Sequence, residues 1–214
     1  DLKVFDINPT VAYRNGPFRI GGGVQIVRSI VELTRDVNLL DSGYVGVELG
    51  GGAGKPTRSL VGLGDRAAAV EPLPEMLGNL RAAVPGAAAV LGTAEVIPLA
   101  EDSADVVIAA QAFHWFDHGR ALPEIARVLR RGGLLALVWN TRDDRDPWVE
   151  KFSGIIGEED ARSSGGAFGT LERVVSVIEG GRFGPVERAS FEHMQHLSRE
   201  TLHDLVLSRS YCAV

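Results

Sequence analysis

The chain has 214 residues, of which 45% are hydrophobic and 23% are charged, which is the composition of one globular domain with a core of its own. Its formal net charge of −6 disfavours nucleic acid and anionic membrane surfaces as main partners, because both attract clustered Lys and Arg. A single cysteine, Cys212, excludes an internal disulfide framework and fits a reducing compartment.

Neither a signal-like N-terminus nor an apolar run of about 18 residues, the length of a membrane span, is present in the sequence. We therefore expect a soluble cytoplasmic protein that acts on a small molecule, and leave a homodimer open. One domain is expected over 1–214, divided into an N-terminal cap (1–40), a cofactor-binding core (41–140) and substrate-side and C-terminal elements (141–214).

In chain order, the polar, glycine-rich opening segment leads into a predicted amphipathic helix over 24–33. Short β-branched or Ala-rich runs then alternate with amphipathic stretches, which is typical of a parallel sheet covered by helices. The patterns predict strands over 44–49, 67–70, 87–91, 105–110 and 134–139, and helices over 55–63, 74–83, 119–130 and 147–156.

The C-terminal part is predicted to contain a loop over 159–168, a weak strand over 185–191 and a helix over 199–207. A strand edge left bare invites aggregation. We therefore expect a partner strand that is truncated, disordered or donated by another copy.

The segment 48–54, ELGGGAG, is the most informative motif, because its glycines leave main-chain N–H groups uncovered before a predicted helix. A dinucleotide fingerprint starting at Gly50 would need glycine where Lys55 stands. A phosphate-binding P-loop would need glycine at Leu49 and a hydroxyl residue at Pro56. Both readings fail.

What remains, Glu-x-Gly-x-Gly-x-Gly, resembles the first motif of class I S-adenosylmethionine-dependent methyltransferases. The resemblance implies an α/β, Rossmann-like fold with a mostly parallel central sheet and helices on both faces, whose last antiparallel strand is missing from this chain. It also implies S-adenosylmethionine as cofactor and S-adenosylhomocysteine as product, with cofactor contacts from Glu48, Gly50, Gly52 and Gly54.

An acidic residue, Glu71, ends the second predicted strand of this core, about 20 residues past the glycines, where a carboxylate can accept hydrogen bonds from a ribose diol. An ordinary surface Glu is the plain alternative. The continuation resembles the family's acid, turn and helix-borne methionine near the adenine, which adds Pro72 and Met76; Met76 can also be simple helix core.

Two further segments follow in the family's order. Residues 92–95, GTAE, resemble the small-residue-plus-acid pair that holds the adenine, which implies Ala94 and Glu95. Gln111 follows a buried strand at its carboxyl end and is expected to line the methionine end of the cofactor. Gly51 and Ala53 depart from the family, which more often has Ala or Cys and Thr or Ser there.

Residues 111–117, QAFHWFD, and 137–143, LVWNTRD, resemble a small-molecule subgroup that includes trans-aconitate-type carboxyl methyltransferases. His114 is the candidate base or substrate-orienting donor, and a backbone-bonded histidine is the alternative. Arg142 is the candidate for holding a substrate carboxylate, and a solvated loop arginine is the alternative.

The sequence thus predicts methyl transfer to an oxygen or nitrogen of a small acceptor. A non-catalytic cofactor-binding or interaction protein of the same fold is the alternative, and a nicotinamide-dependent oxidoreductase is supported by fold analogy alone. No functional metal is expected, because the histidines lack a third and fourth ligand in motif spacing: His114, His118, His193, His196 and His203.

Overall fold

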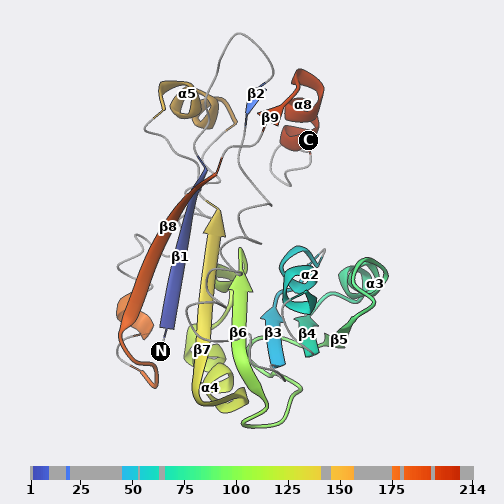
Figure 1. Ribbon diagram of the computed structural model, residues 1–214, viewed down its shortest axis with the longest axis vertical. Coiled ribbons are helices and arrows are strands. Elements are labelled where there is room, and N and C mark those ends of the chain that lie inside the picture. Colours follow the sequence, from blue (N-terminus) through green and yellow to red (C-terminus); the bar gives the residue numbers. More distant parts are fainter. Residues whose placement is uncertain are drawn as a thin grey trace.

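The computed structural model describes residues 2–9, 18–19, 45–52, 54–62, 66–140, 146–156, 175–178, 181–193 and 196–207. Seven strands form one sheet in the order β5-β4-β3-β6-β7-β1-β8, and all neighbouring strands run parallel (Figure 1). In that order they are β5 (Ala87–Leu91), β4 (Arg66–Glu71), β3 (Val45–Leu49), β6 (Ala104–Ala110), β7 (Leu129–Asn140), β1 (Leu2–Pro9) and β8 (Val186–His193). A separate antiparallel pair joins β2 (Phe18–Arg19) to β9 (His196–Leu197).

Helices cover both faces of the large sheet, as the sequence predicts. Val107 of β6 belongs to the same core cluster as Ile125 of α4 (His118–Val128), whereas Val106 clusters with Leu60 of α2 (Lys55–Val61). Neighbouring residues of a strand point to opposite faces of the sheet, so a strand covered by helices on both faces, such as β6, needs apolar side chains on both sides. The other helices are α3 (Pro74–Ala83), the 3-10 helix η1 (Phe113–Trp115), α5 (Pro147–Ile156) and α8 (Arg199–Leu207).

The N-terminal strand corrects one expectation. Residues 2–9 fall in the segment expected to cap the site, but they form β1 inside the sheet, with Leu2 opposite Leu135 of β7 and Val186 of β8. β1 therefore occupies the place beside β8 where a missing strand was expected, and it runs parallel to both neighbours. The helix expected over 24–33 and the loop over 159–168 lie outside the described residues.

Most element boundaries agree with the predicted ones to within two residues, and the start of β7 is the main exception. β7 begins at Leu129, where a helix was expected to continue, because Leu129 pairs with Ala104 of β6. The Arg130 side chain adds bonds to the Asp102 carbonyl and the Asp105 carboxylate. Gly132, with φ of +80°, then allows the strand to continue through the expected turn.

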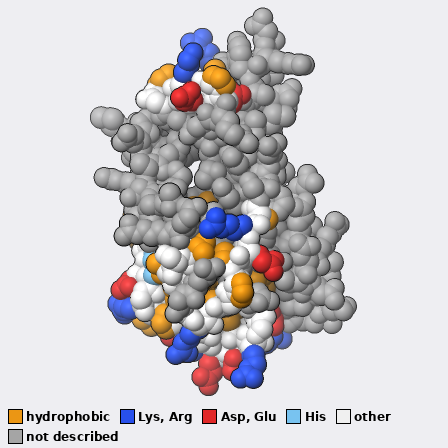
Figure 2. All heavy atoms as spheres, turned by 90° about the vertical axis from the view of Figure 1, so that its left-hand side faces the viewer, with side chains coloured by type: hydrophobic (Ala, Val, Ile, Leu, Met, Phe, Trp, Pro, Cys, Tyr) orange, Lys and Arg blue, Asp and Glu red, His pale blue; other side chains and the backbone are white. Residues whose placement is uncertain are grey.

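The described surface shows mixed charge. On the face in Figure 2, Lys and Arg side chains of the described residues lie among Asp and Glu side chains and hydrophobic ones. Within the described part of the chain, no helix combines the length and the apolar character that crossing a membrane requires.

Candidate functional site

The glycine segment forms a tight turn between β3 and α2. Gly50, Gly52 and Gly54 have φ angles of +73°, +48° and +75°, which L side chains rarely adopt. A Cβ at Gly50 would lie 2.7 Å from the Ala112 Cβ, and one at Gly54 would lie 2.8 Å from a Val84 methyl group. At Gly52 the nearest atom would be a backbone oxygen at 3.9 Å, so a ligand can approach the main chain there.

Gly51 explains one departure from the family pattern. A Cβ at Gly51 would lie 2.6 Å from Cδ1 of Leu80 on α3 and 3.0 Å from the Ala69 Cβ on β4. The close approach of α3 to the loop therefore favours glycine, because any larger residue would have to displace the Leu80 side chain. Ala53, the other departure, lies outside the described residues.

Glu71 ends β4 beside this turn and is only 5% exposed. One carboxylate oxygen accepts the Gly52 N–H at 2.9 Å, and the other accepts the Leu73 N–H at 3.1 Å. A carboxylate can accept about four hydrogen bonds. Glu71 therefore fixes the turn and retains the capacity to accept two ribose hydroxyls, and the alternative of a surface Glu is wrong. Pro72, which follows it, is exposed.

Glu48 lies on β3, 1% exposed, and its carboxyl accepts a hydrogen bond from the hydroxyl of Thr57 on α2. Burial raises the pKa of Glu48 to about 8; the Thr57 hydrogen bonds act in the opposite direction, and the nearby charge of Glu71 adds to the rise. Glu48 therefore retains its proton at neutral pH. Thr57 was not predicted, and its sequence signal is a hydroxyl residue in the first turn of the helix after the glycines.

The loop after β5 carries Ala94 and Glu95. Ala94 is 5% exposed, and a Glu95 oxygen accepts the backbone N–H of Asp117 at 2.8 Å. Partial burial tends to raise the pKa of Glu95, but hydrogen bonds from Asp117 and Thr93 outweigh it and lower that pKa overall. Glu95 is thus held ionised, as an acceptor for an amine.

Met76 lies on α3 and is 38% exposed, whereas Leu77 and Leu80 supply the buried side of the helix. The plain interpretation of Met76 as helix core is therefore wrong. Its exposed thioether remains available to a ligand that lies over the start of α3.

Gln111 follows β6 with φ of +53°, which is uncommon for a residue other than glycine and is often found at functional sites. Its N–H donates to the Val138 carbonyl of β7 at 2.9 Å, and the next residue, Ala112, lies against Gly50. The structure therefore brings the end of β6 to the glycine turn.

Two histidines that follow the end of β6 differ in their surroundings. His118 bonds the Phe113 carbonyl at 3.0 Å through Nε2 and stacks on the Phe113 ring. His114 is half-buried; no described residue bonds its buried Nδ1, and its ring lies 5.0 Å from that of Trp115. Burial lowers the pKa of His114, which favours the neutral imidazole. His118 is therefore bonded to the backbone, and the role of His114 stays a prediction.

The other proposed substrate contact, Arg142, lies outside the described residues. Trp139 at the end of β7 is 9% exposed and packs edge-on against Phe113. Across the ranges that the structure describes, no three His, Cys, Asp or Glu side chains gather as metal ligands would. For His193 and His196 the structure describes the backbone alone, so the clustering of these side chains stays a prediction.

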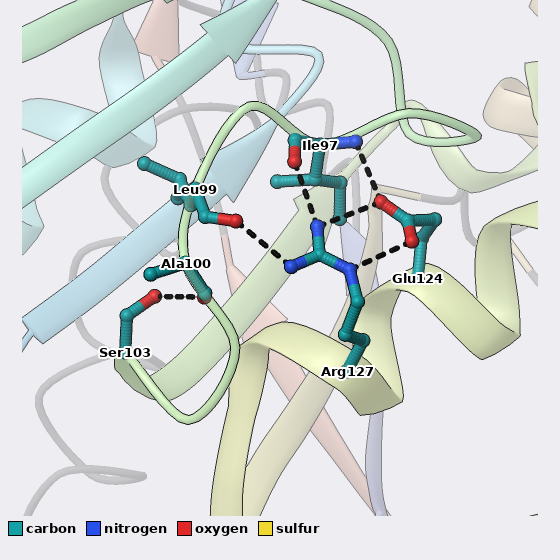
Figure 3. Close-up of polar contacts among 6 residues, drawn as sticks. All are labelled: Ile97, Leu99, Ala100, Ser103, Glu124 and Arg127. Carbon is teal, nitrogen blue, oxygen red and sulfur yellow. Dashed lines mark hydrogen bonds and ion pairs between the residues drawn. The ribbon is translucent and has the colours of Figure 1, made fainter.

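A polar network beside the Ala94 loop was missed by the sequence analysis (Figure 3). Arg127 of α4 donates to both Glu124 oxygens, to the Ile97 carbonyl and to the Leu99 carbonyl, all at 2.8–2.9 Å. Glu124 in turn accepts the Ile97 N–H at 3.0 Å. An acid and an arginine three residues apart on a helix are a sequence signal for such a pair.

Comparison with known proteins identifies the family. Residues 47–137 match the family described as a methyltransferase domain. The chain is 48% identical over 166 residues to an uncharacterized methyltransferase of Mycobacterium tuberculosis, which covers 78% of this chain and 64% of that protein. It is 38% identical over 183 residues to an uncharacterized methyltransferase-like protein of Schizosaccharomyces pombe, which covers 85% of this chain and 70% of that protein.

The fold is similar to that of the YcgJ protein from Bacillus subtilis, with a TM-score of 0.54 at 18% identity over 73% of this chain and 67% of that one. The present chain spans slightly less than two thirds of the length of the mycobacterial relative. On these similarities, and on a parallel sheet whose strand ends carry the glycine turn, the chain belongs to the class I methyltransferases, which use S-adenosylmethionine as cofactor.

Proposed function

We propose that this protein transfers a methyl group from S-adenosylmethionine to an oxygen or nitrogen of a small-molecule acceptor. One observation carries the proposal: buried Glu71 holds the N–H of Gly52 in a turn where a Cβ at Gly52 would meet no atom closer than 3.9 Å. A fixed carboxylate beside an uncovered main chain suits a ligand with a ribose diol and a polar tail. The formal net charge of −6 supports a small molecule over nucleic acid as acceptor.

The described residues fit the parts of the cofactor. Glu71 would accept the ribose hydroxyls, and Ala94 with Glu95 would receive the adenine ring and its exocyclic amine. Gly52 and Gln111 would line the methionine end. Glu48, buried with its Thr57 partner, would support the turn from below, since its exposure of 1% leaves little surface for a ligand.

The cofactor, when bound, supplies a methyl group on a positively charged sulfur, which the acceptor atom takes by in-line displacement as the sulfur leaves with the bond's electron pair. The protein then has to align the acceptor and exclude water, and alignment alone can contribute up to about 7–11 kcal/mol in ideal cases. For a hydroxyl acceptor, or for an amine that has to lose a proton before it attacks, neutral His114 would accept that proton. A carboxylate acceptor needs no base, and Arg142 would then hold it.

The acceptor type can be tested through His114. If a hydroxyl or amine is methylated, His114→Gln should abolish turnover while cofactor affinity stays unchanged. The acidic limb of kcat/KM in the parent should then lie below the ordinary histidine value, because burial lowers the pKa of His114. Full activity of His114→Gln would leave a carboxylate acceptor, and Arg142→Gln should then raise KM.

A non-catalytic protein of this fold is the second candidate function. The structure weakens one of the two sequence observations that suggested it. Gly51, one of the two departures that suggested it, has a packing reason in the contact with Leu80. Cofactor binding without turnover over a broad acceptor screen would favour this candidate.

The direct test is calorimetric titration with S-adenosylhomocysteine, followed by a labelled-methyl screen that begins with small carboxylic acids. The parent should bind at micromolar concentration, and Glu71→Ala should lose about 100-fold or more, because two charge-assisted hydrogen bonds disappear and the turn loosens. Glu75→Ala is the matched control, since Glu75 is exposed on α3 and should change nothing. Absence of binding by the folded parent would refute the proposal.

A further inference from the structure

Helix α4 holds the loop after β5 at three successive points. Near its N-terminus the Asp117 N–H donates to Glu95 at 2.8 Å. Two turns further on, Glu124 accepts the Ile97 N–H at 3.0 Å, and Arg127 donates to the Ile97 carbonyl at 2.8 Å. The loop therefore runs along the helix in the same direction, with its two main-chain groups at Ile97 both held by side chains.

Arg127 makes the strongest of these attachments. Its guanidinium forms two parallel hydrogen bonds to Glu124, both 2.8 Å, and a further one to the Leu99 carbonyl at 2.9 Å (Figure 3). The two side chains are 34% and 24% exposed, so the pair is partly shielded from water. A planar guanidinium matches a carboxylate and two carbonyls at once, which the single ammonium of lysine does not.

The held segment has little regular structure of its own. Its local bonds are an isolated bridge between Thr93 and Val96, the Leu99 N–H to the Ile97 carbonyl at 2.8 Å, and the Ser103 hydroxyl to the Ala100 carbonyl at 2.6 Å. Its ends are fixed by backbone bonds, from Gly92 to the Glu71 carbonyl and from Asp102 to the Arg127 carbonyl. Ile97 itself is 2% exposed. Its place along the helix therefore depends on its own packing and on the Glu124 and Arg127 bonds, and a shift at Ile97 would reach Glu95 two residues away.

We propose that Arg127, with Glu124, is a positioning residue for adenine recognition: it fixes the loop so that Ala94 and Glu95 meet the ring and its exocyclic amine. The inference rests on the proposed function, since it assigns a structural cause to the selectivity of the same site. It predicts that Arg127 governs the choice between bases rather than affinity in general.

The test compares affinities for S-adenosylhomocysteine and S-inosylhomocysteine, in which an oxygen replaces the exocyclic amine. The parent should prefer the adenosyl compound, because the Glu95 carboxylate accepts from an amine and repels an oxygen. Arg127→Gln should reduce this preference about tenfold, most of it through weaker binding of the adenosyl compound, and Glu95→Ala should do the same. Arg127→Lys should recover only part of the preference.

Arg130→Gln is the matched control. Arg130 also binds a carboxylate and a carbonyl, those of Asp105 at 2.6 Å and Asp102 at 3.1 Å, but at the start of β6. Its loss should lower thermal stability and leave the preference for adenine unchanged. Glu124→Gln, which keeps an acceptor for the Ile97 N–H, gives a second and milder variant should Arg127→Gln not fold.

Each outcome decides something. If the parent prefers the adenosyl compound and the folded Arg127 and Glu124 variants keep that preference, the inference is wrong and the proposed function stands. Equal losses for both ligands would likewise overturn it and leave Arg127 with a stabilising role alone. If the folded parent binds neither compound, the proposed function and the inference fall together.

Discussion

Two loops make up the proposed cofactor end of the site, and they are held by different forces. The glycine turn is held by close packing and by the Glu71 carboxylate of β4, and the Glu48 carboxyl of β3 holds Thr57 in the helix that follows the turn. The loop after β5 is held by polar side chains of α4, and Ile97 and Arg127 are 30 positions apart in the sequence.

The difference bears on how each loop should respond to change. Few residues other than glycine fit the glycine turn, because an added Cβ would lie too close to neighbouring side chains and because the φ angles are positive. A single substitution there should therefore cause a large loss of stability or affinity. A network of hydrogen bonds at a partly exposed surface can lose one bond at a time, so the second loop should respond gradually. Substitutions in the two loops test this contrast.

The largest effect is expected at Glu48. The folded-state pKa of about 8 lies above the ordinary value of 4.5, so the folded protein binds more protons between these values. Stability of the parent should therefore fall as pH rises through this window, by up to about 1.4 kcal/mol per pH unit. Glu48→Gln should remove this slope, which urea unfolding at pH 5, 6.5 and 8 would measure. Parallel curves for parent and variant would contradict the assignment.

Gly52→Ala should damage binding more than folding. The new Cβ meets nothing closer than 3.9 Å, so the cost to stability is the left-handed backbone, about 1–2 kcal/mol. The methyl group would stand where the ligand approaches, and affinity for S-adenosylhomocysteine should fall at least about tenfold, equivalent to 1.4 kcal/mol. Gly78→Ala on α3, where no atom lies within 4 Å, is the control. Unchanged affinity would place the ligand elsewhere.

Gly51→Ala should show the reverse order of effects. Its Cβ would lie 2.6 Å from the Leu80 side chain, and overpacking of this kind costs about 1–3 kcal/mol. The midpoint of urea unfolding should decrease, and affinity should decrease only as far as α3 is displaced. A variant as stable as the parent would show that Leu80 can move aside.

The smallest effect is expected at Asp117, in the second loop's support. Its side chain accepts the Gly119 N–H at 3.1 Å and caps α4, so Asp117→Ala should lower stability by about 0.5–2 kcal/mol. The backbone N–H that binds Glu95 is retained, so affinity should change by less than about threefold, which is under 1 kcal/mol. A larger loss of affinity, measured by calorimetry, would show that the second loop is as sensitive as the first.

The same contrast explains what the sequence could predict. The glycine turn, Glu71 and Gln111 belong to short patterns at the ends of predicted strands, and the structure brings all three together. Arg127 and Glu124 carry no such pattern, because their task depends on which loop lies beside α4. The reason for glycine at position 51 is also a tertiary contact, with Leu80. From the sequence alone, the departure from the family pattern at Gly51 suggested a non-catalytic protein instead.

β1 was missed for a related reason. Its eight residues precede a polar, glycine-rich region, and the strands that flank it in the sheet begin more than a hundred residues later, at Leu129 and Val186. Nothing local distinguishes a segment that pairs at such a distance from one that covers a site.

The position of β1 also sets an order for assembly. β8 joins the sheet through β1, which pairs with it on one edge and with β7 on the other. During synthesis, residues 2–9 are made before Val186–His193 and cannot be enclosed until that strand has been made, and contacts so far apart in sequence slow folding. The half of the sheet that carries the glycine turn needs neither strand, so it can form first, and β1 and β8 would close the other half as a late step.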